Sequence, residues 1–208
     1  MDMKALYKIS YGMYLLTVRQ MGVDNGCIIN TAMQVSQDPL RIAISVQKSN
    51  KTHDMIRNTG LFCISALTKE ADFSFYKHFG MQSGADVDKF ADFPHVTRTT
   101  STVYRLSKYA NMYATAVVTQ EVDLGSHTLF IADITEAEVL SDEEPCTYAD
   151  YHSTIKPKAT PAAPEAPAEK KQWVCVVCGY VYEGEEVPDD YVCPWCKHGK
   201  ADFEPLNA

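Results

Sequence analysis

The stretch from Trp173 to Phe203, WVCVVCGYVYEGEEVPDDYVCPWCKHGKADF, decides how the end of this chain folds. It contains two Cys-x-x-Cys pairs, Cys175/Cys178 and Cys193/Cys196, with fourteen residues between them. Each pair can bend into a knuckle that points both thiolates inward, and two facing knuckles form a tetrahedral site of four sulfurs, which suits zinc or iron. Because two pairs at this spacing are far more specific than one, the pattern predicts a metal site rather than buried free thiols.

Aromatic side chains are unusually dense around the two cysteine pairs. A segment this short cannot build a large apolar core, so we expect the metal and an aromatic cluster to stabilise it together. The aromatic residues are Trp173, Tyr180, Tyr182, Tyr191, Trp195 and Phe203.

The motifs of residues 172–208 are C-x-x-C-G-Y-x-Y, P-D-D-Y-V-C-P-W-C and D-F-E, and they resemble rubredoxin. The short loop between the knuckles is more similar to the rubredoxin-type tail of rubrerythrin. The resemblance implies one iron, held by the four cysteines, that cycles between ferrous and ferric states and carries one electron. Gly179 can adopt the positive φ that such a knuckle favours, whereas Lys197 stands where the family usually has glycine. A zinc ribbon is the alternative.

Composition limits the classes of partner. The chain has 208 residues and a net charge of −8, which argues against nucleic acid as a partner. No apolar run is long enough to span a bilayer and the first residues form no signal peptide, so we expect a cytoplasmic protein without a membrane partner. Of the seven cysteines, Cys27, Cys63 and Cys146 are left over, and we expect them to be reduced thiols.

A domain boundary is clear at residues 157–171, PKATPAAPEAPAEKK, which contain four prolines and no large apolar residue. This composition predicts a semi-rigid linker that cannot form a core. It separates a larger domain, residues 1–156, from the small cysteine-containing domain, residues 172–208.

Residues 1–156 have many β-type segments and few helical ones, which predicts a mainly β domain built as a closed or partly open barrel. A turn is expected at residues 22–26, where Asn25-Gly26 is a strong hairpin signal. Helices are expected over residues 49–58, ending at Gly60, and over residues 69–79. The expected strands cover residues 13–18, 27–36, 41–47, 61–67, 112–122 and 127–140.

Three places in this domain could carry chemistry. Small polar residues interrupt the strand at Asn30–Ser36, which indicates either a ligand edge or a plain exposed strand end. Ser49–Thr52 begin a helix, where free backbone N–H groups favour a phosphate, although ordinary capping explains the same residues. His127 opens a strand and is either structural or functional, and Lys89 and Tyr151 are equally ambiguous.

Taken together and in order, these segments resemble the flavin reductase-like family with its FMN-binding split barrel. The shared motifs are S-x-D-P, S-x-K-T, F-x-I-S-x-L, D-K-F and G-S-H-T-L-F-I-A-D-I. The resemblance implies FMN bound non-covalently at a homodimer interface, with His127 as a hydrogen-bond partner of the flavin or nicotinamide rather than an acid or base. The implied FMN contacts are Ser49, Lys51 and Thr52 at the phosphate, Asn30, Thr31, Ala32, Met33, Gln34 and Ser36 along the ring, and Lys89 and Tyr151 around the ring or the nicotinamide.

The two-domain architecture is similar to the high molecular weight rubredoxins of anaerobes. That similarity implies an NAD(P)H:rubredoxin oxidoreductase, in which a hydride passes from NAD(P)H to FMN and single electrons pass to the iron. A flavodiiron protein that reduces nitric oxide or dioxygen is the implied acceptor. One alternative is a free-flavin or ferric reductase with an accessory metal module, and another is a non-catalytic zinc-ribbon binding protein. No dinucleotide fingerprint is present, so NADH and NADPH both remain open.

Overall fold

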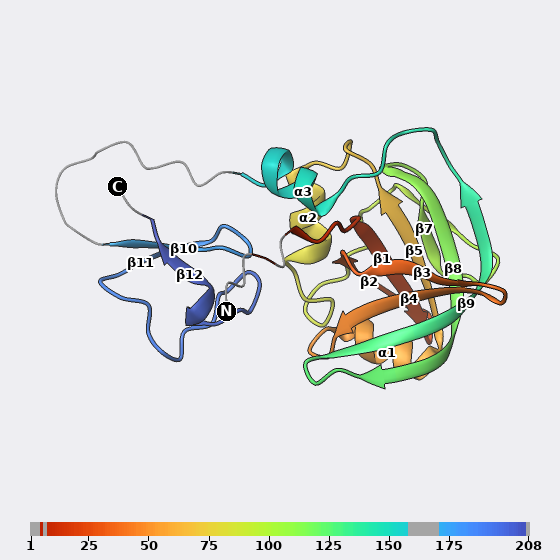
Figure 1. Ribbon diagram of the computed structural model, residues 1–208, viewed down its shortest axis with the longest axis horizontal. Helices are drawn as coiled ribbons and strands as arrows, with labels where there is room; N and C mark the ends of the chain where they lie inside the picture. Colours follow the sequence, from red (N-terminus) through yellow and green to blue (C-terminus); the bar gives the residue numbers. More distant parts are fainter. Residues whose placement is uncertain (1–4, 6–7, 158–170, 207–208) are drawn as a thin grey trace. The chain divides into compact units, whose positions relative to one another are not determined.

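The structure, a computed structural model, describes residue 5 and residues 8–157 and 171–206. It divides into two compact units, Met1–Ser153 and Thr154–Ala208 (Figure 1). The linker predicted at residues 157–171 lies almost wholly outside the described residues, so its stiffness stays a prediction. Among the described residues, no helix has both the length and the apolar character that a membrane crossing requires.

One seven-stranded antiparallel sheet, ordered β2-β1-β5-β8-β9-β4-β3, makes the first unit. The sheet curls round (Figure 1), and its end strands β2 and β3 do not pair with each other in the described residues, so the barrel is split. This confirms the mainly β split barrel expected from the sequence. The strands are β1 Tyr14–Gln20, β2 Val23–Ile29, β3 Ala32–Gln37, β4 Leu40–Gln47, β5 Leu61–Leu67, β8 Ala110–Asp123 and β9 His127–Val139.

The barrel core is formed by apolar side chains from the strands and from helix α1, Lys51–Thr59. Leu16, Ile44, Phe62 and Phe130 come from four different strands and are fully buried, and Ile56 adds a fully buried side chain from α1. Burial of each such side chain contributes about 1.5–3 kcal/mol. Helix α1 is therefore held against the strands of the barrel by its buried side chains.

Both ends of α1 follow local sequence signals. The Asn50 side chain accepts a hydrogen bond from the Thr52 N–H at 3.0 Å, and Gly60 ends the helix at φ +66°, a left-handed conformation that glycine adopts without a Cβ clash. The predicted helix is confirmed within two residues at its start. Helix α2, Phe73–Gly80, begins four residues later than predicted, because Asp72 caps it by accepting from the Phe75 N–H at 3.1 Å.

The hairpin turn predicted at Asn25-Gly26 is wrong. The connection between β1 and β2 is Met21-Gly22, with φ of +50° and +85°, and two positive φ values match the twist of a two-residue hairpin. Asn25 and Gly26 lie inside β2 and are buried. A Cβ on Gly26 would lie 3.0 Å from the Leu16 carbonyl oxygen and 3.1 Å from the Phe90 ring, so packing between strands favours glycine there.

A second hairpin, β6 Val96–Arg98 and β7 Tyr104–Leu106, lies in and just beyond the region predicted to be rich in loops. Arg98 fastens it to β2 with two hydrogen bonds to the Asp24 carboxylate, at 2.6 and 2.7 Å. The Arg98 guanidinium also stacks 3.4 Å over the Tyr104 ring. The unit ends with α3, Tyr148–Asp150, and a π-helical turn, Tyr151–Ile155, continues from it.

The second unit has a three-stranded sheet, ordered β11-β10-β12, and a 3₁₀ turn at Lys200–Asp202. Its strands are β10 Gln172–Cys175, β11 Val181–Glu183 and β12 Phe203–Pro205. The Tyr191 ring lies 4.6 Å from the ring of Tyr182 and 5.4 Å from that of Phe203. The expected aromatic cluster is thus present beside the cysteine pairs.

Candidate metal centre and flavin site

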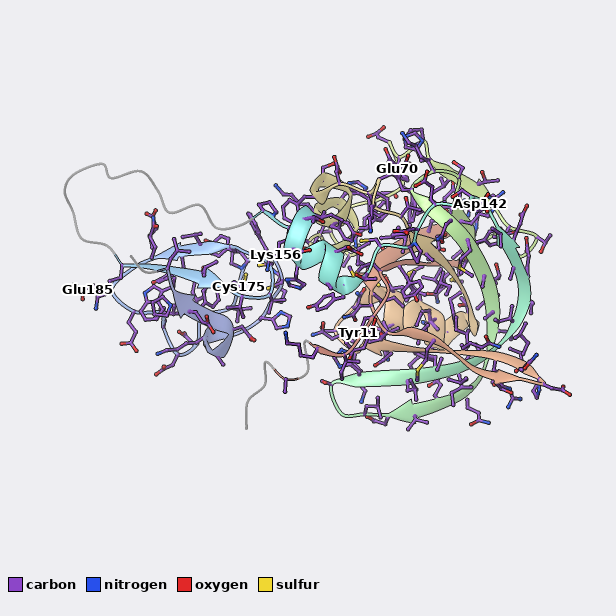
Figure 2. The ribbon with its side chains drawn as sticks, turned by 45° about the horizontal axis from the view of Figure 1, so that its top comes forward. Tyr11, Glu70, Asp142, Lys156, Cys175 and Glu185 are labelled. Atoms are coloured by element: carbon purple, nitrogen blue, oxygen red, sulfur yellow. The ribbon has the colours of Figure 1, made fainter. Side chains whose placement is uncertain are left out.

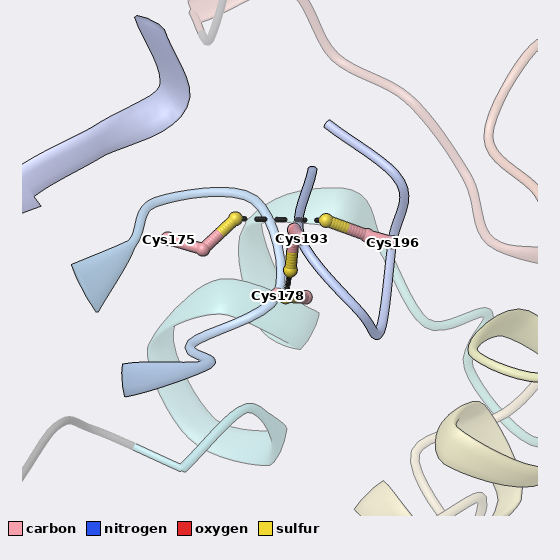
Figure 3. Close-up of side chains that lie close together, drawn as sticks. All are labelled: Cys175, Cys178, Cys193 and Cys196. Carbon is pink, nitrogen blue, oxygen red and sulfur yellow. Dashed lines mark hydrogen bonds between the residues drawn. The ribbon is translucent and has the colours of Figure 1, made fainter. Parts of the chain in front are cut away.

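The four predicted cysteine ligands meet at one point of the second unit, with all four Sγ atoms within 4.8 Å of one another (Figure 3). The Sγ–Sγ distance is 3.5 Å for Cys175 and Cys196 and also 3.5 Å for Cys178 and Cys193, so each close pair takes one sulfur from each knuckle. Sulfurs bound to a single tetrahedral metal at about 2.3 Å lie about 3.8 Å apart. The donor set therefore fits one metal ion with four thiolate ligands.

The four thiols do not ionise alike when no cation lies between them. Hydrogen bonding from Cys196 lowers the pKa of Cys178 to about 5, and the same contact raises the pKa of Cys196. Burial raises the pKa of Cys175 to about 11. A cation is therefore needed to hold all four groups as thiolates near neutral pH.

The two knuckles share one backbone geometry. The Gly179 N–H donates to the Cys175 carbonyl at 2.7 Å, and the Lys197 N–H donates to the Cys193 carbonyl at 2.9 Å. Both donors have positive φ, +81° for Gly179 and +63° for Lys197. Lys197 therefore adopts the left-handed conformation of the glycine it replaces, at a steric cost that glycine does not have.

Replacing Lys197 with glycine is expected to stabilise the second unit by about 0.5–1 kcal/mol, because the relief of left-handed strain exceeds the extra chain entropy of glycine. Thermal unfolding of the metal-loaded protein, followed by loss of the metal–thiolate absorption, measures the gain. Lys197→Ala is the matched control, since it removes the same ammonium but keeps the Cβ and should show no gain. Equal midpoints for the glycine and alanine variants would contradict the explanation.

In the first unit, strand register brings together three of the segments predicted to bind FMN. Ala32 of β3 pairs with Ile44 of β4, and Gln47 at the end of β4 pairs with His127 at the start of β9. Helix α1 begins at Lys51, directly after β4. The starts of β3, α1 and β9 therefore lie at the same end of the sheet.

Strand β3 offers an open edge to a planar ligand. In the described residues it pairs only with β4, so the backbone N–H and C=O groups of its other edge are not used by the sheet. Thr31, just before the strand, is held by a hydrogen bond of 2.7 Å from its hydroxyl to the Ser45 carbonyl. The side chains of Met33 and Gln34 are exposed. This edge fits a flat ring, although the individual contacts predicted for Asn30–Ser36 stay a prediction.

The start of α1 forms a corner suited to an anion. The Lys51 ammonium donates to the Gly84 carbonyl at 2.8 Å, and the fully buried Thr52 hydroxyl accepts from the Asn25 side-chain amide at 3.1 Å. A Cβ on Gly84 would lie only 2.0 Å from the Asn25 Oδ1 atom, so glycine lets this loop approach the helix start. Ser49 is exposed beside it.

Asn25 and Gly84 are parts of this corner that the sequence does not predict. The sequence predicts a turn at Asn25, and Gly84 belongs to no motif. The signal for Asn25 is a polar residue in an apolar strand segment, and the signal for Gly84 is a glycine in a loop. Both signals are common in sequences, and the contact between the two residues is what shows that they belong to one site. The corner as a whole combines the positive end of a helix dipole with an ammonium group, which fits a phosphate.

His127 lies at the start of β9 with its Nδ1 atom 2.9 Å from the Ser126 hydroxyl. The hydroxyl of the next residue, Thr128, lies 2.9 Å from the Nε2 atom of the buried His53. The Nδ1 atom of His53 lies 2.9 Å from the Asp54 carboxylate. His53 therefore ties α1 to the strand that carries His127, a support that sequence reasoning missed.

The side chains of Lys89 and Tyr151 make contacts within the first unit that support its fold. The Lys89 side chain is 3 % exposed, and its ammonium donates to the carbonyls of Gly26 and Phe79 at 2.9 and 2.8 Å. Burial lowers the pKa of Lys89. The Tyr151 ring packs 4.6 Å from that of Tyr76. A direct contact of either residue with the flavin ring or nicotinamide stays a prediction.

Both units match known families. The flavin reductase like domain matches residues 6–156, and the rubrerythrin, rubredoxin-like domain matches residues 173–204. The high molecular weight rubredoxin of Moorella thermoacetica is 34% identical and covers 99% of this chain and 100% of its own. The ferric-chelate reductase (NAD(P)H) of Archaeoglobus fulgidus is 39% identical over 76% of this chain and 93% of its own.

Solved structures support the fold of the first unit. The NADH:FAD oxidoreductase of Streptomyces globisporus superposes with a TM-score of 0.62 at 20% identity, covering 68% of this chain and 82% of that one. The FMN-binding protein of Thermus thermophilus gives a TM-score of 0.58 at 18% identity, covering 64% and 74%. At these identities the likeness concerns the fold alone.

The split barrel and the four-sulfur site define a flavin-type oxidoreductase with a rubredoxin-type metal module. The chain belongs to the flavin reductase-like family, and its last residues add a rubredoxin-like domain. FMN and a single iron are the cofactors that these two domains imply, and the α1 corner and the four cysteines are the parts of the structure that fit them.

Proposed function

We propose that this protein is an NAD(P)H:rubredoxin oxidoreductase that delivers single electrons to a separate acceptor protein. When bound, FMN supplies the conversion of a hydride from NAD(P)H into single electrons, and the iron supplies a one-electron carrier. The observation that carries the proposal is the meeting of Cys175, Cys178, Cys193 and Cys196 within 4.8 Å on a chain whose larger domain is flavin reductase-like.

The residues of the first unit would bind and orient the flavin. Lys51 and the backbone N–H groups at the start of α1 would hold the phosphate, with Ser49 at its exposed side. Thr52, predicted as a phosphate contact, has a buried hydroxyl that accepts from Asn25, so its part in the proposal is its place in this first turn. The edge formed by Asn30–Ser36 would lie along the ring, and His127 would donate or accept a hydrogen bond at the ring or the nicotinamide. Contacts at this site from Lys89 and Tyr151 belong to the same proposal.

A homodimer through the flavin domain is part of the proposal. The exposed fractions of Met33, Val35 and Leu40, on and beside the β3 edge, are 61%, 44% and 44%. Three large apolar side chains on an open strand edge are a surface that association would cover. Sedimentation of the full chain would measure the dimer directly.

The acceptor we propose is a flavodiiron protein that reduces nitric oxide or dioxygen. The cysteine-containing domain exposes Glu183, Glu185, Glu186, Asp189 and Asp190, an acidic surface suited to brief docking on a basic partner. The half-buried Cys196 is the ligand nearest to solvent, so electrons leave most readily on its side. A linker keeps donor and carrier at an effective concentration of about a millimolar.

The test is an absorption spectrum of the purified protein, followed by anaerobic titration with NADH and with NADPH. We expect flavin and ferric–thiolate bands, and we expect the iron bands to bleach only after the flavin begins to be reduced. Iron bands that never bleach would end the proposal. Colourless protein that contains zinc would support the alternative of a zinc-ribbon binding protein.

A free-flavin or ferric reductase is the second candidate. It is favoured by the Archaeoglobus relative, which is named a ferric-chelate reductase and whose match covers 76% of this chain. This candidate predicts that steady-state turnover with the physiological acceptor does not depend on the four-cysteine site. The rates of Cys178→Ser with free FMN, a ferric chelate and the acceptor protein separate the two functions.

A further inference from the structure

A lysine from the start of the second unit binds the first metal knuckle. The unit begins at Thr154, and Lys156 donates from its ammonium to the carbonyls of Val176 and Val177 at 2.9 and 3.0 Å. These are the two residues between Cys175 and Cys178. Figure 2 labels Lys156 and Cys175 in this unit. The ammonium is therefore held at a fixed place on the loop that carries two of the four sulfurs.

The stem of this side chain packs against the knuckle at Gly179. A Cβ built on Gly179 would lie 3.5 Å from the Lys156 Cε atom, an ordinary van der Waals distance, so the lysine stem and the turn are direct neighbours. Burial lowers the pKa of Lys156, and the nearby cysteine sulfurs oppose that shift. The ammonium contacts the carbonyls of the two residues that separate Cys175 from Cys178, so the cation lies beside the ligands of the first knuckle.

Lys156 differs from the other described lysines of the unit. Lys200 pairs with the carboxylates of Glu186 and Asp189 at 3.0 and 2.7 Å. Lys171 and Lys197 are exposed. Among these four lysines, Lys156 is the one whose ammonium donates to two backbone carbonyls of a knuckle, so its charge is held where solvent screens it less.

We propose that Lys156 is a positioning residue that raises the reduction potential of the iron held by the four cysteines and fixes the Val176-Val177 segment of their first knuckle. The inference rests on the proposed function, which supplies the iron. Four thiolates with ferrous iron carry one more negative charge than with ferric iron, so a nearby fixed cation stabilises the reduced form more. Net charge and solvent exposure are the factors that set such potentials.

The experiment uses the full-length, iron-loaded protein and measures the iron's midpoint potential by spectroelectrochemical titration. For Lys156→Gln we expect the equilibrium constant for reduction to fall about threefold to tenfold, a drop of about 30–60 mV at 59 mV per tenfold for one electron. Lys156→Arg keeps the charge and should stay close to the wild-type potential. Lys200→Gln removes an equal charge from the same unit and is the matched control.

The second measurement is the rate at which a chelator removes the metal. The fixed segment should make Lys156→Gln lose metal several-fold faster than Lys200→Gln, with Lys156→Arg between them, and this result stands even if Lys156→Gln holds iron too briefly for a titration. A potential and a removal rate of Lys156→Gln equal to those of Lys200→Gln would overturn the inference. Failure of the proposed function is distinct, since it shows in the wild type as absent or redox-silent iron.

Discussion

Replacing Cys178 with serine is expected to abolish iron binding and to slow electron delivery to the acceptor protein by about a hundredfold or more, because the carrier that the linker holds at high effective concentration is lost. Cys178 is buried, and its sulfur lies 3.5 Å from that of Cys193, so serine leaves three thiolates and an open position. Because metal binding supplies the folding energy of so small a module, the second unit should also lose its structure. NAD(P)H oxidation with free acceptors should continue.

Metal analysis, the ferric–thiolate absorption and stopped-flow transfer to the acceptor measure these effects. Cys63→Ala is the control, since Cys63 is a buried thiol of the barrel and its loss should leave the iron bands in place. Transfer to the acceptor at the wild-type rate in Cys178→Ser would show that electrons leave directly from the flavin, and the relay would then be wrong.

The elements that the sequence predicted well are those whose signals are local. Asn50 and Gly60 mark the ends of α1 through capping and positive φ, and the two Cys-x-x-Cys pairs carry their own turn geometry. These features depend on residues within a few positions of one another. Neighbouring residues in the chain are enough to define them, so a single sequence reveals them.

The features that the sequence does not reveal depend on contacts between distant residues. Asn25-Gly26 has the composition of a hairpin turn, but packing against Leu16 and Phe90 places it in a strand. The two carbonyls that bind Lys89 belong to residues 63 and 10 positions away. Local propensity contains no information on such partners, and tertiary packing overrides it.

The arrangement of the candidate flavin site depends on the pairing register of the strands, which sequence motifs do not show. The pairing of Gln47 with His127 places the predicted phosphate and nicotinamide segments at one end of the sheet, which the order of segments along the chain does not show. The loop that closes the α1 corner is joined to it by the hydrogen bond from Lys51 to the Gly84 carbonyl and by the close approach of Gly84 to Asn25. That loop is therefore the most direct place to test whether the corner binds FMN.

Replacing Gly84 with alanine is expected to weaken FMN binding by about tenfold to a hundredfold. The added Cβ would lie 2.0 Å from Asn25 Oδ1, so either the loop or the Asn25 side chain must move. The first movement breaks the bond to Lys51, and the second removes the donor to the buried Thr52 hydroxyl. Overpacking of this kind costs about 1–3 kcal/mol, and 1.4 kcal/mol is a factor of ten in affinity.

Fluorescence titration of the flavin-free protein with FMN measures the dissociation constant. Gly199→Ala is the matched control, because its new methyl group would meet nothing within 4 Å and its affinity should equal that of the wild type. Because the contact we propose for the corner is with the phosphate rather than the ring, riboflavin, which lacks the phosphate, should lose much less affinity than FMN in Gly84→Ala. Equal losses for the two flavins would instead place the phosphate away from α1 and assign the defect to general disturbance of the barrel.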